Sequence, residues 1–200
     1  MKKYNSIALL DQLQADTRQM ILRVTQLQYA DPGLLLENPG SGQWSLIEIL
    51  DHLNSYTRYY LGALENSLQK EIPAVENFKP GLLGDYFTKL MQPGENGRVK
   101  NKMRSPKDHR PSNIIDTRSV IETFLEHQQY LLNLLEKAKT RNIGKLRTPI
   151  SISTLIKLKT GDVFRFLVAH EQRHFVQLEN TMNAVKAVRT DKYPAALPAV

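Results

Sequence analysis

The chain has 200 residues and a formal net charge of +7; 41% of its residues are hydrophobic and 24% are charged. This size and composition are typical of one globular domain with a substantial core, which we take to span residues 1–200. Cysteine is absent, which excludes disulfides, thiolate metal sites and a cysteine nucleophile. No apolar run reaches the length of about 18 residues that a membrane-spanning helix needs, and the N-terminal run is too short for a secretory signal. We therefore expect a cytoplasmic protein with no membrane segment.

An amphipathic segment comes first in the chain. Residues 6–29 carry apolar side chains at helical spacing, and the Asp-Pro-Gly sequence at 31–33 ends the predicted helix. The following residues, 34–43, contain one proline and two glycines, which predicts a loop.

A second helix is expected from Ser45 to about Leu68. Ser45 and Glu48 have the spacing of a capping box, in which the serine oxygen accepts a backbone amide and the glutamate reaches back to the cap. Glu48 has an alternative role one turn before His52, where it could orient that imidazole. We favour the cap.

A long connection over 71–111, rich in glycine and proline, separates the second helix from the third. One short helix is expected inside it, over 82–91. A connection this long is unusual as a structureless loop but fits a crossover along the outside of a helical bundle.

The segment 98–110 inside this connection is strongly basic. We interpret it as a solvated loop, with an anion-binding loop beside a pocket as the alternative. Sequence-specific nucleic-acid binding is not expected, because no aromatic residues lie between the charges to stack on bases.

The remaining chain predicts two more long helices. One should run from Asn113, capped by Ser112 or Asn113, to Lys139. Residues 148–158 alternate briefly and could be extended or form a short hairpin. Thr160-Gly161-Asp162 should cap the last helix, and the tail over about 190–200 should be poorly ordered or lie along the surface. Four long helices with almost no strand pattern predict an all-α fold, a four-helix bundle with a long crossover connection between helices 2 and 3.

The last helix carries His170 and His174 on its apolar face, one turn apart. Side chains at i and i+4 are neighbours, with roughly 5–6 Å between their Cβ atoms. Two imidazoles at this distance can share one metal ion, whose bonds to nitrogen measure about 2.0–2.1 Å. The alternative is a pair of core histidines that are hydrogen-bonded to neighbours.

His170-Glu171-Gln172-Arg173-His174 also fits the short zincin metallopeptidase pattern H-E-x-x-H. The extended metzincin pattern requires glycine and a third histidine downstream, but Gln177 and Asn180 stand there. The chain also offers no convincing sheet to align a peptide. We therefore do not expect Glu171 to act as a peptidase base.

A third metal ligand would come from a facing helix, since ligands in helical bundles project inward from several helices. His52, on the second helix, is the natural candidate, although a lone histidine at a helix seam is the alternative. We expect His127 to be a core or seam histidine and His109 to be solvated in the basic segment. Arg173 and Gln177 are expected to hold contacts around the ligands rather than to do chemistry.

Two separated motifs resemble a known family, the DinB-like metal-binding four-helix bundles, which include thiol-dependent S-transferases resembling YfiT. The first motif is Trp44-Ser45-Leu46-Ile47-Glu48-Ile49-Leu50-Asp51-His52-Leu53, and the second runs from Phe166 through His170, Arg173 and His174 to Gln177. The resemblance implies a bundle with a long crossover after its second helix. It also implies a metal triad of His52, His170 and His174.

The resemblance implies a metal-dependent enzyme whose open metal position activates a thiol or water. Its most concrete form is thiol (S-) transfer to a small electrophile. Alternatives are metal-dependent hydrolysis of small amides or esters, and a non-catalytic metal-binding module of a stress response. The residues leave open whether the chain is an enzyme, which residues would be catalytic, and its oligomeric state, a homodimer included.

With no cysteine, imidazole nitrogens suit zinc or nickel. Because the ligands must be neutral, we expect the site to lose its metal below about pH 6, near the ordinary histidine pKa of about 6.5.

Overall fold

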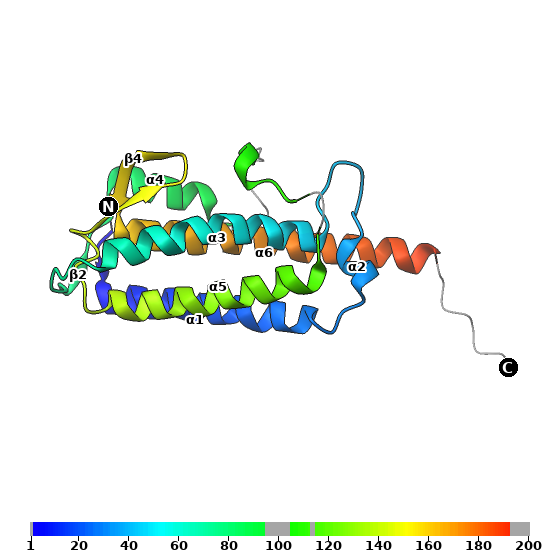
Figure 1. The fold of residues 1–200 in the computed structure, drawn as a ribbon, viewed down its shortest axis with the longest axis horizontal. Coiled ribbons are helices and arrows are strands. Elements are labelled where there is room, and N and C mark those ends of the chain that lie inside the picture. The colour runs from blue at the N-terminus through cyan, green and yellow to red at the C-terminus, as the bar shows by residue number, and fades with distance from the viewer. Residues whose placement is uncertain (1, 95–104, 113–114, 193–200) are drawn as a thin grey trace.

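A computed structural model describes residues 2–94, 105–112 and 115–192, with side chains described as far as Thr190. The described chain is mostly helical. Its long helices are α1 (Ser6–Leu27), α3 (Leu46–Leu68), α5 (Thr117–Ala138) and α6 (Thr160–Lys192). These four lie lengthwise beside one another (Figure 1), with α3 packed against α5 and α6, and α1 packed against the same two helices.

Shorter elements complete the described structure. Helix α2 spans Pro32–Leu36, α4 spans Leu82–Met91, and a 3-10 turn, η1, spans Lys107–His109. Strands β3 (Arg147–Ile150) and β4 (Ser153–Lys159) form an antiparallel hairpin with an irregular register between Pro149 and Ile150. Strands β1 (Tyr4–Asn5) and β2 (Asn77–Phe78) form a second antiparallel pair.

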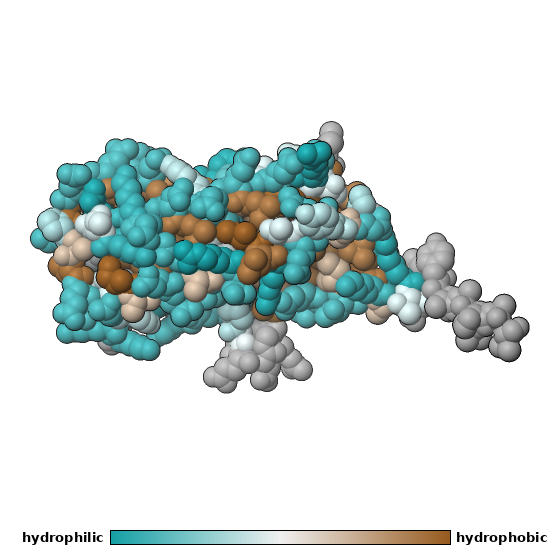
Figure 2. All heavy atoms as spheres, turned by 90° about the horizontal axis from the view of Figure 1, so that it is seen from below, coloured by the Kyte–Doolittle hydropathy of each residue, from teal (hydrophilic) through white to brown (hydrophobic). Residues whose placement is uncertain are grey.

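The core lies where the apolar stripes of the long helices meet. Seen from the side of α1 and α5, hydrophilic residues cover most of the surface, and hydrophobic residues show between them in a band along the long axis (Figure 2). Burying such stripes is the dominant favourable contribution to folding. The buried residues include Leu10, Leu13, Met20, Val24, Ile49, Leu53, Leu64, Ile121, Phe124, Leu131, Leu135, Val163, Leu167 and Leu178.

The capping box at the start of α3 is confirmed. The Ser45 Oγ accepts from the Glu48 backbone N–H at 3.3 Å, and Glu48 Oε2 accepts from the Ser45 N–H at 2.7 Å. Glu48 Oε2 also accepts from the side chain of Asn38 at 2.7 Å. Its carboxylate therefore secures the entry to α3, as the sequence favoured, rather than an imidazole.

Three helix starts differ from the predictions. Residues 32–36 were expected to be non-helical, but the Asp31 side chain accepts the N–H groups of Gly33 and Leu34 and caps the short helix α2. The third long helix begins at Thr117, later than predicted, because the Asp116 side chain caps it by accepting the Arg118 N–H at 3.2 Å. The predicted start, Asn113, lies outside the described residues.

At the start of α6, Asp162 has a different role from the predicted one. Asp162 lies within the first turn of the helix rather than before it, and its Oδ2 accepts the Gly81 N–H at 2.8 Å. The carboxylate thus ties the chain ahead of α4 to α6. Of the two possibilities for residues 148–158, an extended segment or a short hairpin, the structure has the hairpin, β3–β4. The β1–β2 pair was missed because two-residue strands show no period.

Residues 98–104 of the basic segment, with Arg98, Lys100, Lys102 and Arg104, lie outside the described residues. The described part, 105–110, contains η1, which packs against α3. None of the helices in the described part of the chain combines enough length with enough apolar character to cross a membrane.

Candidate metal centre

The structure brings His52, His170 and His174 together. One nitrogen from each ring can be chosen so that all three lie within 4.8 Å of one another. His52 comes from α3 and the other two from successive turns of α6. His52 Nε2 and His174 Nε2 are 3.2 Å apart, and the centroids of the His170 and His174 rings are 4.6 Å apart.

This spacing fits a shared ion. Two nitrogens bound to one tetrahedral ion at about 2.0–2.1 Å lie about 3.3 Å from each other, close to the distance between the two Nε2 atoms. In addition, His170 Nδ1 is buried and has no hydrogen-bond partner among the described residues. A buried ring nitrogen without a partner is costly, and a metal ion would remove that cost if it took this atom as its ligand.

Two further contacts fix which ring nitrogen faces the cluster. His52 Nδ1 donates to the backbone carbonyl of His109 at 2.6 Å, and His174 Nδ1 donates to Gln177 Oε1 at 2.9 Å. Each outer nitrogen therefore holds the hydrogen, and each Nε2 keeps its lone pair for the cluster. Such contacts orient the ligands and set the tautomer in known metal sites.

Burial keeps the three imidazoles neutral. Loss of solvent is the largest influence on each: it lowers the pKa of His52, lowers that of His170 well below its ordinary value, and lowers that of His174 to about 3. The other imidazoles of the cluster lower the pKa of His170 and His174 further, since two positive charges would repel. Neutral rings are the form that binds metal.

His109 is only partly exposed, so the prediction that it is solvated holds only in part. Its ring stacks on Tyr56, with 3.9 Å between centroids, and its Nδ1 lies 2.7 Å from the Ser55 Oγ. The centroid of the Tyr56 ring in turn lies 4.6 Å from that of the His170 ring. These contacts of His109 could not be predicted from the sequence, because His109 lies in a loop, where helical spacing does not indicate which residues are neighbours. His127 is half-buried on α5 and lies outside the three-histidine group, as expected.

Glu171 points away from the three histidines. It is fully buried, and its Oε1 accepts from Thr57 Oγ1 at 3.1 Å and from Gln128 Nε2 at 2.7 Å. It therefore links α6 to α3 and α5. Burial raises the pKa of Glu171 to about 7. The sequence did not predict that Thr57 and Gln128 bind Glu171. Each is a polar residue among the apolar residues of its helix, and this pattern does not show which residue it contacts.

The three histidines open onto a cavity of about 1610 Å³. Small-molecule sites commonly measure about 300–1,000 Å³, so this cavity has room for a substrate beside a second small molecule. The buried side chain of Arg173 and the side chain of Gln177 also line it, while Trp44 and Tyr56 flank His52.

Comparison with known proteins adds a family to this geometry. Residues 9–178 match the model of the DinB superfamily. Comparisons with curated proteins and with solved structures gave no significant match. The family match covers most of the chain, from α1 into α6, and includes all three clustered histidines. This protein therefore belongs to the DinB superfamily.

Proposed function

We propose that this protein is a metal-dependent enzyme in which His52, His170 and His174 hold one divalent transition ion, zinc or nickel. The observation that carries the proposal is the meeting of three neutral imidazoles on a cavity wall, two of them with Nε2 atoms 3.2 Å apart and outer nitrogens already occupied. Among the described residues the group has three members, which supports an open coordination position of the catalytic kind.

The reaction we propose is transfer of a small thiol to an electrophilic small molecule. A bound divalent ion supplies Lewis acidity, which lowers the pKa of a thiol or a water at its open position. The thiol sulfur forms a bond to the electrophilic carbon, the bond from that carbon to its leaving group breaks with its electron pair, and the S–H proton passes to solvent. The size of the cavity supports this reaction because both reactants must be held at once.

The chain's own residues prepare the site for such a reaction. The His109 carbonyl and Gln177 hold two imidazoles in one tautomer, so no reorganisation of the ligands is needed. Trp44 and Tyr56 pack beside His52 and limit its contact with water. Burial raises the pKa of Tyr56 to about 12, so its hydroxyl stays protonated.

The proposal extends to the architecture. The four long helices would form a metal-binding four-helix bundle within a single domain, with the chain between α3 and α5 as the crossover. Its support is the lengthwise packing of α1, α3, α5 and α6 and the family match.

Metal analysis of purified protein tests the proposal first. We expect about one divalent ion per chain, and a sharp loss of metal in His52→Ala, His170→Ala and His174→Ala. His127→Ala should keep its metal, and so should His109→Ala, since the backbone carbonyl that holds His52 remains. A His52→Ala protein that binds metal like the parent would refute the triad.

A thiol-consumption assay then tests the reaction. Metal-loaded protein should accelerate loss of thiol with a small alkylating electrophile, and the His52→Ala protein should not. Metal-loaded protein that leaves the thiol untouched but hydrolyses small esters or amides would replace S-transfer with hydrolysis.

A further inference from the structure

The cavity at the histidine cluster has two unlike ends. Helices α3 and α6 run antiparallel along it, since His52 lies beside His174 whereas Tyr60 lies beside Phe166. From the cluster toward Phe166, the described lining residues include no charged side chain. This end is lined by Tyr60, Phe87, Leu90, Met91, Ile150, Ser151, Ile152, Leu158 and Phe166.

The other end of the cavity is mixed in character. Its lining residues include the polar or charged Asn38, Glu48, Arg110, Gln177 and Asn180 beside the apolar Leu36, Trp44 and Ile115. At the apolar end the polar groups satisfy each other instead: the Tyr60 hydroxyl lies 3.3 Å from Ser151 Oγ and accepts the Ser151 N–H at 3.3 Å. The apolar end therefore offers a ligand mainly carbon surface.

Aromatic rings lead from the cluster into this apolar end without a break. Phe166, one turn before His170 on α6, stacks on the His170 ring with 6.1 Å between centroids and 19° between planes. The centroid of the Phe166 ring lies 5.8 Å from that of Tyr60 and 6.5 Å from that of Phe87. A group bound against Phe166 would thus lie next to a proposed metal ligand.

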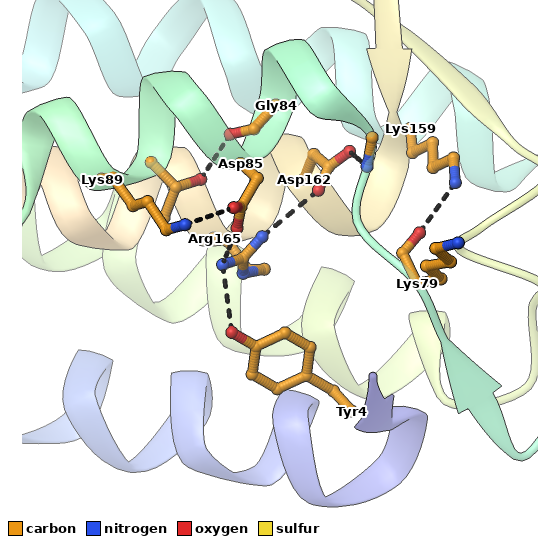
Figure 3. A network of polar contacts seen from close by, with 10 residues as sticks. Tyr4, Lys79, Gly84, Asp85, Lys89, Lys159, Asp162 and Arg165 are labelled. Atoms are coloured by element: carbon orange, nitrogen blue, oxygen red, sulfur yellow. Dashed lines mark hydrogen bonds and ion pairs between the residues drawn. The ribbon is translucent and has the colours of Figure 1, made fainter. Parts of the chain in front are cut away.

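Helix α4, which contributes Phe87, Leu90 and Met91, is fixed in place by a polar network (Figure 3). Arg165, on α6, is buried and pairs with Asp85 on α4 at 3.0 Å and with Asp162 at 3.4 Å. Lys89 holds the other oxygen of Asp85 at 2.8 Å. Lys89 and, after it, Arg165 hold the pKa of Asp85 below its ordinary value, so the pairs persist near neutral pH. The apolar wall is therefore preformed.

From these contacts we infer that the substrate carries an apolar group, aliphatic or aromatic, and that the wall of Phe166, Tyr60, Phe87 and Leu90 binds it while its reactive end reaches the histidine cluster. This inference rests on the proposed function for the identity of the reactive end. The position of the wall relative to the cluster does not depend on it. The wall is continuous with the proposed metal site, and apolar surface is stabilised by leaving water.

A homologous series of straight-chain alkyl hydroxamic acids tests the inference, because the hydroxamate head can chelate a metal at an open position while only the tail varies. Binding to zinc-loaded protein is measured by titration calorimetry, from acetohydroxamic to octanohydroxamic acid. We expect the affinity to rise about threefold to fourfold for each added methylene, since burial of one methylene contributes about 0.8 kcal/mol.

Two variants locate the tail. Phe87→Ser and Leu90→Ser should reduce the gain per methylene while leaving the affinity for acetohydroxamic acid unchanged. Leu82→Ser is the matched control: Leu82 is on the same helix but 80% exposed, and the cavity lining does not include it. The Leu82→Ser protein should show the same gain in hydroxamic acid affinity per methylene as the parent. Circular dichroism on each variant verifies that the helices are intact.

The outcomes separate the two claims. A parent protein that binds acetohydroxamic acid but gains nothing from longer tails overturns the inference and leaves the metal site standing, as does an unchanged gain in both wall variants. A parent that holds no metal overturns the proposed function. In that case straight-chain alcohols, which need no metal, replace the hydroxamic acids, and the lack of a chain-length gain with them overturns the inference.

Discussion

Gln177 acts on the candidate metal centre through one hydrogen bond to the outer nitrogen of His174, at 2.9 Å. Without that acceptor, the His174 ring can rotate or adopt the other tautomer, which turns a hydrogen toward the cluster. Loss of such an outer contact commonly weakens metal binding about 10- to 100-fold. We therefore expect Gln177→Leu to reduce zinc affinity by that factor with unchanged helix content, as measured by competition with a chromophoric chelator.

Asn180 provides the comparison for this substitution, since it lies one turn further along the same cavity wall. Asn180→Leu makes a similar change in polarity and size, and we expect it to leave the affinity as it is. Equal affinities for all three proteins would show that Gln177 does not orient the ligand.

Glu171 makes a second prediction at the level of single residues, concerning stability. Its pKa is about 7 in the folded protein, against an ordinary value of 4.5. Between these values the folded protein holds a proton that the unfolded chain releases. The stability associated with that proton is therefore complete below about pH 4.5 and is lost as the pH rises through 7.

Glu171→Gln removes this titration but retains an oxygen that can accept from Thr57 and Gln128. We expect the variant to gain stability relative to the parent as the pH is raised from 5 to 8. Urea unfolding of the metal-free proteins at several pH values measures this difference. Parallel stability curves would mean that Glu171 is not protonated in the folded protein.

At the scale of elements, the close packing of α4 on α6 depends on Gly84. A Cβ atom at this position would lie 2.4 Å from the Cβ of Asp162, the residue that also holds the Gly81 N–H. Replacing a helical glycine with alanine normally stabilises by roughly 0.5–1 kcal/mol, but overpacking of this kind costs about 1–3 kcal/mol. The clash outweighs the gain, so we expect Gly84→Ala to be destabilising.

Gly62, on α3, is the matched control, because a Cβ there would meet nothing within 4 Å. Gly62→Ala should therefore show the normal gain. Chemical denaturation of the two variants measures the contrast. A stabilised Gly84→Ala protein would show that α4 does not pack against α6 in this way.

The elements that sequence reasoning could predict are those whose signal is local. Ser45 and Glu48 lie three residues apart, which predicts a capping box. The apolar stripe that carries His170 and His174 repeats at every helical turn. Asp162 could not be interpreted correctly, because its partner is the amide of Gly81, far away in the chain. The role of Glu171 could not be predicted for the same reason, since its hydrogen-bond partners, Thr57 and Gln128, are distant in the sequence. The contact between the His109 carbonyl and His52 also joins residues that are distant in the sequence.

At the scale of the whole molecule, folding itself prepares the histidines for metal. His52 and His174 are far apart in the chain, and only the packing of α3 on α6 brings their Nε2 atoms to 3.2 Å. The same packing removes the rings from water and lowers their pKa values. This revises the expectation from the sequence, which used the ordinary histidine pKa to place metal loss below about pH 6.

Protons compete with metal only where they bind the folded site, and for His174 that occurs at a pKa of about 3. The unfolded chain, by contrast, takes up protons below about 6.5. As the pH falls from 6.5, the unfolded state therefore binds more protons than the folded state, and the metal-free protein loses stability. The lowered pKa values of His52 and His170 act in the same direction, so the affinity of the folded site for metal should fall less over this range than ordinary histidines would predict.

We therefore expect dialysed protein to keep most of its zinc at pH 5.5, while the melting temperature of the chelator-treated protein falls between pH 7 and pH 5.5. The metal-loaded protein should melt higher at both pH values, because an ion that binds only the folded state stabilises it by mass action. The His52→Ala protein should show no difference between chelator-treated and metal-treated samples. Loss of half the zinc near pH 6.5 would mean that the imidazoles are accessible to protons in the folded protein.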